Sequence, residues 1–315
     1  MRWGAEPEAL EEFARHLRSG ADRLANLPSL ASAARGWDGP DAEELRVRLR
    51  RSAARPAARL ARDLHALARR VVSAAREQRS ASQVVPAPVT ERAAGAAGGR
   101  LVQRVGPVDA PVVVLLVPGV GTDLTDGQRL RRDATRVWTV LAAASSEPVA
   151  VVSWLGYDPP DTVPGAADPR PASEGAALLA HEVAARRAAG ARRVVVVGHS
   201  YGALVAGRLV AATAAGPSVG PARPDVAVLL GAPGEGPPGG LGRVPASMTV
   251  VTARERDDPI AWAAAVAGPL HGPDPVGRLP RLPTGGRGHG AYLSDRVLLD
   301  ALADLTVPGP VPFRR

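Results

Sequence analysis

Residues 192–215 read RRVVVVGHSYGALVAGRLVAATAA, and this stretch decides the fold. Four consecutive valines at 194–197 predict a strand buried on both faces, and the alanine-rich, leucine-punctuated run that follows predicts a helix packing back over it. Between the two stand Gly198, His199, Ser200, Tyr201 and Gly202, a G-x-S-x-G pattern. So tight a turn strains the serine backbone and leaves no room for side chains two residues to either side, which is why glycine occupies both places.

The size and composition of the chain allow a large domain together with an accessory one. The chain has 315 residues, of which 45% are hydrophobic, enough for a substantial core. All 39 cationic residues are arginine, and with 34 glycines and 31 prolines this composition is typical of a high-GC genome, so we attach no function to the net charge of +8. The absence of cysteine excludes disulfides, a thiol nucleophile and thiolate metal sites.

The excess positive charge is concentrated in one segment. Residues 1–45 carry a net charge of −4, residues 46–100 carry +10, and the remainder is near neutral. An acidic helix next to a basic one offers the arginines a simpler partner than nucleic acid, and no nucleic-acid motif or aromatic stacking platform accompanies them. We therefore expect no nucleic-acid binding. The start of the chain lacks the apolar core of a signal peptide, and no apolar run reaches membrane-spanning length, so we expect a cytoplasmic protein without a transmembrane segment.

The first 80 residues predict an α-helical hairpin. Leu10, Phe13, Leu17 and Leu24 recur at helical spacing in the first helix, and Leu45, Leu49, Leu60, Leu64, Leu67 and Val71 do so in the second. Asp41 is a candidate cap for the second helix, and Pro56 is expected to kink or split it. The turn between them contains Trp37-Asp38-Gly39, which resembles the WXG motif of small helical-hairpin proteins exported by type VII secretion systems. An ordinary hairpin closed by a packed tryptophan is the alternative.

A linker and a second domain follow the hairpin. Residues 81–100 combine proline, glycine, serine and alanine without periodicity, which predicts a linker. From residue 101 to 315, strand candidates alternate with helix candidates, which predicts a mostly parallel sheet with helices on both faces. The expected strands are residues 112–117, 149–154, 194–197, 226–230, 248–253 and a short one near Leu279. The expected helices are residues 127–144, 173–189, the run after the turn at Ser200, and a terminal helix containing Leu298, Leu299, Leu302 and Leu305.

In this setting the turn at Ser200 resembles the nucleophile elbow of α/β-hydrolases. A serine hydroxyl needs a base to take its proton and a carboxylate to orient that base, and in this fold they follow the serine in the order acid, then histidine. Only His271 and His289 come after Ser200. His289 lies between the last strand candidate and the terminal helix, where the fold places its base, and His271 is the alternative.

The acid is expected directly after the strand 248–253. Asp258 is our first candidate and Asp257 the second, and an acidic helix cap before Pro259 is the alternative role for either.

Charge that develops on a substrate oxygen needs fixed hydrogen-bond donors. The fold supplies one from the residue after the nucleophile, here the Tyr201 amide. A second is expected from the glycine-rich loop after the first core strand, where we select the amide of Val120 or of Gly121, with a plain glycine turn as the alternative. Neither metal ions nor organic cofactors are needed for this chemistry.

With these residues assembled, the second domain resembles a family of α/β-hydrolases first catalogued as a domain of unknown function and common in high-GC Gram-positive bacteria. The stretches that carry the resemblance are VPGVGT (117–122), WLGYDPP (154–160), GHSYG (198–202), GAPG (231–234), DPI (258–260), HGPDP (271–275) and GHGAY (288–292). The resemblance implies Ser200, Asp258 and His289 as a catalytic triad and selects Asp258 over Asp257. It implies no particular substrate. Gly290 departs from the pattern, because members of the family often carry a serine there.

These observations lead to two functional hypotheses. The first is a serine hydrolase that cleaves a small carboxylic ester through an acyl-enzyme, with amides and thioesters as alternatives. The loops 155–172, 232–247 and 268–288 contain few large apolar residues, so we expect no lipase-type lid and a preference for short acyl chains. The second is a secretion-linked protein or toxin in which the hairpin docks to a helical partner, with leaderless export in place of a cytoplasmic location.

Overall fold

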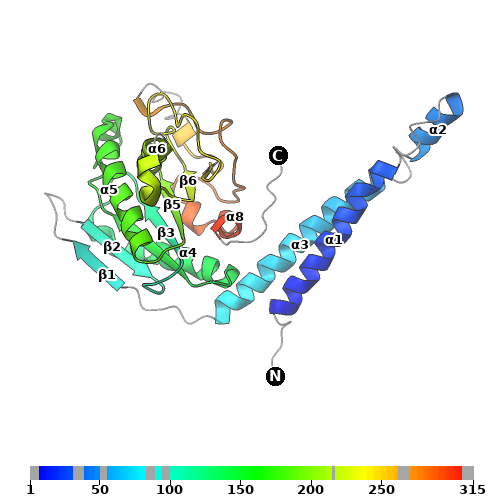
Figure 1. Cartoon of the computed structure of the whole chain (residues 1–315), viewed down its shortest axis with the longest axis horizontal. Coiled ribbons are helices and arrows are strands. Elements are labelled where there is room, and N and C mark those ends of the chain that lie inside the picture. Colours follow the sequence, from blue (N-terminus) through cyan, green and yellow to red (C-terminus); the bar gives the residue numbers. More distant parts are fainter. Residues whose placement is uncertain are drawn as a thin grey trace. The chain divides into compact units, whose positions relative to one another are not determined.

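The computed structural model describes residues 7–30, 39–49, 55–82, 89–93, 100–214, 217–261 and 270–306. The chain divides into two compact units, Met1–Gln83 and Val84–Arg315 (Figure 1). No helix within the described ranges is both long enough and apolar enough to cross a membrane.

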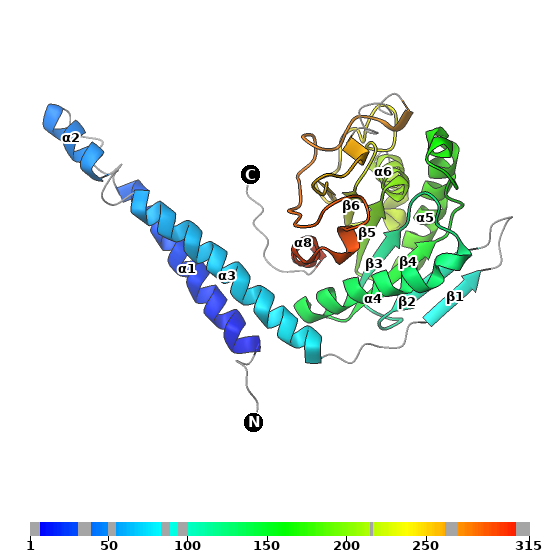
Figure 2. The ribbon, with the colours of Figure 1, turned by 180° about the vertical axis from the view of Figure 1, so that it is seen from behind.

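The first unit is built from the helices α1 (Pro7–Leu30), α2 (Pro40–Leu49) and α3 (Arg55–Ser82). Helices α1 and α3 lie side by side and run in opposite directions (Figures 1 and 2). Their buried positions are alanines, most of them seven residues apart: Ala14 and Ala21 on α1, and Ala57, Ala61, Ala68 and Ala75 on α3. A repeat of seven keeps one face of a helix turned toward its neighbour, and alanine lets the two backbones approach closely.

The larger apolar residues of the predicted stripes are divided between this seam and the surface. Phe13, Leu60 and Leu67 are exposed, with 51%, 49% and 42% of their surface accessible. The other large residues of the stripes are partly buried and alternate with the buried alanines at spacings of three and four: Leu10, Leu17 and Leu24 on α1, and Leu64 and Val71 on α3.

Ion pairs join the acidic helix to the basic one. Arg79 near the end of α3 pairs with Glu8, at 3.2 Å, and with Glu11. His65 lies 3.4 Å from Asp22. Each of these pairs is partly exposed, so we expect only a small contribution to stability from each.

The second helical segment is split, as its proline suggests. Pro56 is the second residue of α3, in the first turn, where a missing N–H breaks no helical hydrogen bond. Residues 50–54, which separate α2 from α3, lie outside the described residues, and so do Trp37 and Asp38 of the WXG-like turn. Gly39 is described and has a φ of +134°.

The second unit contains a seven-stranded sheet in the order β1-β2-β4-β3-β5-β6-β7. The strands are β1 (Val89–Ala93), β2 (Arg100–Val105), β3 (Val112–Val117), β4 (Val149–Leu155), β5 (Arg193–His199), β6 (Val226–Leu230) and β7 (Thr249–Ala253). Strands β4, β3, β5, β6 and β7 are mutually parallel, and β1 and β2 add an antiparallel edge. This is the α/β fold with a mostly parallel sheet that the sequence predicts.

Two local predictions need correction, and one strand was not predicted. The segment 81–100 is not linker throughout, because β1 lies inside it and pairs with β2 from Val89 opposite Arg104 onward. Strand β2 itself was not predicted, because Gln103 and Arg104, although buried, interrupt its apolar run. Near Leu279 the described residues form no continuous strand, only isolated bridges such as the one between Val276 and Leu279.

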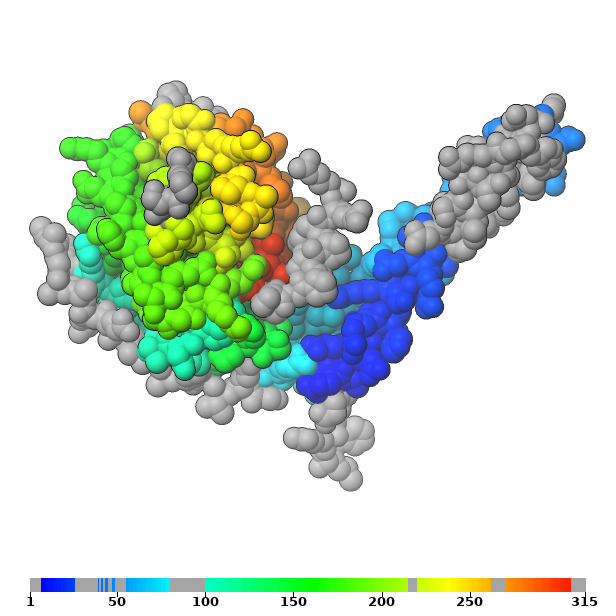
Figure 3. Space-filling model, viewed as in Figure 1, coloured from blue at the N-terminus to red at the C-terminus, as the bar shows by residue number. Residues whose placement is uncertain are grey.

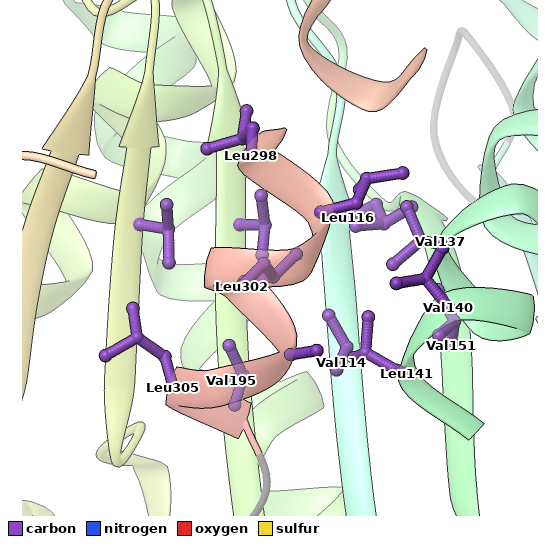
Figure 4. Packing of buried hydrophobic residues seen from close by; sticks show 14 of the residues in the cluster. Val114, Leu116, Val137, Val140, Leu141, Val151, Val195, Leu298, Leu302 and Leu305 are labelled. Carbon is purple, nitrogen blue, oxygen red and sulfur yellow. The ribbon is translucent and has the colours of Figure 1, made fainter. Parts of the chain in front are cut away.

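Helices cover both faces of the sheet. They are α4 (Gly127–Ala144), α5 (Arg170–Ala188), α6 (Tyr201–Ala214) and α8 (Arg296–Thr306). Alternate strand residues pack against α4 and α8 on one face and against α5 and α6 on the other. Figure 4 shows the first of these layers, where Leu298 and Leu302 of α8 pack with Val114, Leu116 and Val195 of the strands.

The topology brings four loops to one edge of the sheet. Strands β3, β5, β6 and β7 are neighbours and parallel, so their carboxyl ends lie at the same edge. The segments after β6 and β7, yellow and orange in Figure 3, gather at one end of the unit. In open α/β sheets this edge is where ligands bind.

Candidate active site

Ser200 occupies a strained position at the tip of the turn between β5 and α6. Its φ is +57°, and it is one of two non-glycine residues with positive φ among those described, the other being Asp257. The Ser200 amide donates to the Leu230 carbonyl at the end of β6, at 2.9 Å, and the Ser200 carbonyl accepts from the Ala203 amide, also at 2.9 Å. Backbone hydrogen bonds on both sides therefore hold the serine in a conformation that costs free energy.

Three glycines make room for this turn. A methyl group on Gly198 would lie 2.3 Å from the Gly202 carbonyl oxygen, and one on Gly202 would lie 2.2 Å from the Val117 carbonyl oxygen. The spacing of G-x-S-x-G thus has the steric cause that the sequence suggests. Gly119, for which we predict no separate role from the sequence, is the third, because its methyl group would come within 2.8 Å of the Ser200 Cβ.

Asp258 and His289 form a hydrogen-bonded pair. The Nδ1 atom of His289 lies 3.0 Å from Oδ1 of Asp258 and 3.1 Å from Oδ2. The Asp258 side chain is fully buried, whereas 31% of the His289 side chain is exposed. A carboxylate accepts only, so Nδ1 carries the proton and Nε2 is the atom left to act as a base.

Other donors hold the Asp258 carboxylate in place. Oδ1 accepts the Ile260 amide at 2.9 Å, and Oδ2 accepts the hydroxyl of Tyr292. Burial by itself would raise the pKa of Asp258, but the hydrogen bonds from Tyr292, Ile260 and His289 outweigh it and hold the pKa below its usual value. Asp258 is therefore ionised near neutral pH.

The loop that carries His289 is tied to the loop that carries Asp258. The Gly288 amide donates to the Arg256 carbonyl at 2.8 Å, and Arg256 forms an isolated bridge with Arg287. The loops of Asp258 and His289 are thus joined through backbone as well as through side chains.

The alternative candidates lie elsewhere. Asp257 is exposed, with a φ of +61°. His271 is buried and its Nε2 lies 2.8 Å from the Ala166 carbonyl oxygen, in the loop after β4. In the described part of the chain, Asp257 makes no hydrogen bond to a histidine, and His271 makes none to an aspartate.

The candidate oxyanion donors have different environments. The Gly121 amide already donates to the Pro160 carbonyl, at 2.9 Å. Among the described residues, the amides of Val120 and Tyr201 have no such partner. The loop carrying Val120 lies at the elbow, because a methyl group on Gly119 would be 3.1 Å from the Tyr201 amide nitrogen. Of the two alternatives, we therefore retain Val120 over Gly121 as the second donor.

Ser200 is the one triad candidate that makes no side-chain hydrogen bond in the described part of the chain. Its neighbour His199, however, contacts the ring of His289 directly, with ring centroids 4.8 Å apart. This contact brings His289 to the residue before Ser200, and no hydrogen bond joins the Ser200 hydroxyl to Nε2 in the described part of the chain. Hydrogen bonds of this kind are often long in free enzymes and tighten on substrate binding. Within the described ranges, no group of three or more histidine or acidic side chains could hold a metal ion.

A family model described as alpha/beta hydrolase matches residues 95–268. The chain belongs to this family. The matched range contains the elbow and Asp258, and it ends before His289.

Two proteins of Mycobacterium tuberculosis, the uncharacterized proteins MT2140 and Rv2079, are each 32% identical to this alpha/beta hydrolase over 145 residues. The match covers 43% of the chain and 21% of either relative, so the chain spans about a fifth of the length of the curated relatives it matches.

Two solved structures with low sequence identity also match the chain. LAE6, an alpha/beta hydrolase enzyme from the metagenome of Lake Arreo, is 16% identical, with a TM-score of 0.44 over 76% of this chain and 86% of that one. A hyperthermophilic esterase from the archaeon Pyrobaculum calidifontis is 15% identical, with a TM-score of 0.44 over 75% of this chain and 89% of that one.

Proposed function

We propose that the chain is a serine hydrolase that cleaves carboxylic esters through an acyl-enzyme, with Ser200, His289 and Asp258 as its triad. The observation that carries the proposal is the buried carboxylate of Asp258 bound to Nδ1 of His289, beside a serine held at a positive φ. An orienting carboxylate, a histidine base and a serine at a strand-to-helix turn are the parts that acyl transfer needs. Membership of the alpha/beta hydrolase family supports the same reaction class.

The proposed reaction has two halves. The Ser200 oxygen bonds to the substrate carbonyl carbon while Nε2 of His289 accepts the hydroxyl proton. The amides of Tyr201 and Val120 stabilise the oxyanion, and His289 then gives its proton to the departing alcohol as the ester C–O bond breaks. Water attacks the acyl-enzyme by the same route and releases the acid. Asp258 stays ionised throughout and keeps the proton of His289 on Nδ1.

We expect small substrates with short acyl chains. The loops 155–172, 232–247 and 268–288 follow β4, β6 and β7 and contain few large apolar side chains. A long acyl chain needs a large apolar surface to replace water, and these loops supply little of it.

The proposal is tested with a series of p-nitrophenyl esters from acetate to palmitate. We expect the wild type to hydrolyse the short esters fastest, and Ser200→Ala to lose at least about 10³-fold in kcat/KM. Ser145→Ala is the matched control, because Ser145 follows α4 at the opposite edge of the sheet from Ser200. Equal activity of Ser200→Ala and the wild type would refute the proposal, and a rate maximum at palmitate would refute the preference for short chains.

A second candidate function is binding of a helical protein by the hairpin. The observation that favours it is the exposure of Phe13, Leu60 and Leu67 beside the alanine seam. Phe13 lies on α1 and Leu60 and Leu67 lie on α3, and a helical partner that packs on this pair of helices would cover such side chains.

Comparing residues 84–315 with the full chain distinguishes a hairpin that binds a partner from one that completes the hydrolase unit. If the shortened protein stays soluble and equally active, the hairpin is free to serve a partner. If it aggregates or loses activity, the hairpin instead completes the hydrolase unit, which argues against the partner-binding function.

A further inference from the structure

Tyr292 connects the two loops that carry the acid and the base. It is 1% exposed and begins a short 3-10 turn, Tyr292–Ser294, three residues after His289. Its hydroxyl donates to Oδ2 of Asp258 and accepts the amide proton of Glu255 at 3.1 Å. A single oxygen therefore binds both the side chain of the acid and the backbone of the loop before it.

The ring of Tyr292 lies against the base and against the elbow. It meets the His289 ring edge-on, with centroids 6.3 Å apart and planes at 89°. It also packs on the His199 ring, at 5.4 Å. Tyr292 thus contacts Asp258 through its hydroxyl, and His199 and His289 through its ring.

Space for this contact is provided by Gly231, at the end of β6. Gly231 has a φ of +52°. A methyl group there would lie 2.9 Å from Cε2 of Tyr292, 3.0 Å from its hydroxyl and 3.1 Å from Oδ2 of Asp258. The neighbouring strand thus leaves open the place where the phenol meets the carboxylate.

The position of the carboxylate depends on this contact. Both oxygens of Asp258 lie nearly equally far from Nδ1 of His289, so that hydrogen bond alone does not fix the carboxylate plane. One outside donor binds each oxygen, the Ile260 amide on Oδ1 and the Tyr292 hydroxyl on Oδ2. Without the hydroxyl, the plane is fixed from one side only, and a fully buried charge loses a donor.

His199 also holds the loop of His289, through a hydrogen bond to its backbone. Its Nε2 lies 2.8 Å from the His289 carbonyl oxygen, which only accepts, so Nε2 carries the proton. Burial and the nearby His289 lower the pKa of His199 to about 4, so the ring stays neutral and keeps this hydrogen bond at neutral pH.

We propose that Tyr292 is a positioning residue of the triad, which sets the plane and the basicity of Asp258 and thereby holds His289 in the geometry that activates Ser200. The proposal rests on the serine hydrolase function above. The titratable groups facing this contact are Glu255 and Asp258 after β7, His199 at the end of β5, and His289. Asp295 at the start of α8 and Arg129 on α4 act from beyond them.

The sign of the pH effect follows from the hydrogen bond. Removing the Tyr292 hydroxyl makes Asp258 more basic and strengthens its remaining bond to His289. Both changes raise the apparent pKa at which the acid–base pair loses its activating form, so the acidic limb of the rate profile moves to higher pH.

The test compares Tyr292→Phe with Tyr157→Phe. Tyr157 is a matched control for the acidic limb, because it is also buried and its hydroxyl donates to a backbone carbonyl, that of Pro118, at 2.7 Å. For Tyr292→Phe we expect labelling by a fluorophosphonate to slow by about 10- to 100-fold at neutral pH, the range that loss of one hydrogen bond to a charged group gives. We also expect the acidic limb to move to higher pH in this variant alone. An unchanged rate and limb in folded Tyr292→Phe would overturn the proposal.

Two further measurements keep the outcome unambiguous. Site-specific replacement of Tyr292 by 3-fluorotyrosine preserves the shape and makes the phenol a stronger donor, so the acidic limb of the rate profile should move to lower pH. A shift to higher pH contradicts the proposal.

NMR titration of the His289 imidazole needs no catalysis. If the wild type is not labelled at all, the serine hydrolase function fails, whereas a changed His289 titration in Tyr292→Phe still supports the contact proposed here.

Discussion

The hydrolase unit and the hairpin bury their apolar surface in opposite ways. The sheet of the hydrolase unit packs valines and leucines from both faces against its helices, and Leu141, Leu204 and Leu298 are almost completely buried there. The hairpin buries alanines such as Ala68 between its helices and leaves Phe13 and Leu67 exposed. The hydrolase unit is stabilised by filled volume and the hairpin by close backbone approach, so the same kind of substitution should affect them differently.

The largest effect is expected where the hydrolase unit also depends on close approach, at the elbow. Gly202→Ala places a methyl group 2.2 Å from the Val117 carbonyl oxygen, so the backbone of β3 or of α6 must move. We expect a loss of more than about 4 kcal/mol in the unfolding free energy of this unit. Gly239→Ala is the control, since nothing lies within 4 Å of that site.

Chemical denaturation, followed by the fluorescence of the buried Trp138 and Trp154, measures this loss. A Gly202→Ala protein as stable as Gly239→Ala would show that the elbow is not sterically constrained.

The next effect separates the two kinds of packing. Leu141→Ala leaves a cavity between α4 and the sheet and should destabilise the hydrolase unit by about 2–5 kcal/mol. In the hairpin the damaging change is the reverse one: Ala68→Leu forces α1 and α3 apart and should cost about 1–3 kcal/mol.

Hydrogen exchange resolved by peptide shows which unit loses protection in each variant. Loss confined to the unit that carries the substitution supports the comparison. Increased protection of the hairpin in Ala68→Leu would mean that the alanine seam is loosely packed.

The last expected effect is a pH dependence that belongs to the hydrolase unit. Burial first, and then the neighbouring Asp295 carboxyl, raise the pKa of Glu255 from 4.5 to about 7. The folded unit therefore keeps a proton that the unfolded chain releases. The associated stability is complete below about pH 4.5 and declines as the pH rises to about 7, by at most about 3 kcal/mol.

Glu255→Gln should remove this decline and leave the hairpin unaffected. The difference in unfolding free energy between variant and wild type, measured near pH 5 and near pH 8, is therefore expected to favour the variant more at the higher pH. A difference independent of pH would place the Glu255 carboxyl in an environment that does not favour its protonated form.

Elements defined by local pattern could be predicted from the sequence. Strands β3 and β6 and helix α4 begin and end where continuous apolar runs or helical periodicity place them. Strands β1 and β2 could not be located, because their stability comes from pairing with each other and with β4 rather than from an apolar pattern of their own.

The candidate site divides in the same way. Ser200, Asp258 and His289 stand out because the motif and the order of the elements require such residues. The hydroxyl of Tyr292 and the Gly121–Pro160 hydrogen bond leave no pattern in the sequence, since they depend on which loops meet in space. The buried alanines of the hairpin were not predicted, because the leucines beside them are the stronger apolar signal.

The most direct test of the central claim is the intact mass of the protein after reaction with a fluorophosphonate. The wild type should gain the mass of a single adduct, and Ser200→Ala and His289→Ala should gain none, because an activated serine needs both its own oxygen and its base. An adduct that persists in Ser200→Ala, or a folded wild type that gains none, would contradict the assignment of Ser200 as the nucleophile.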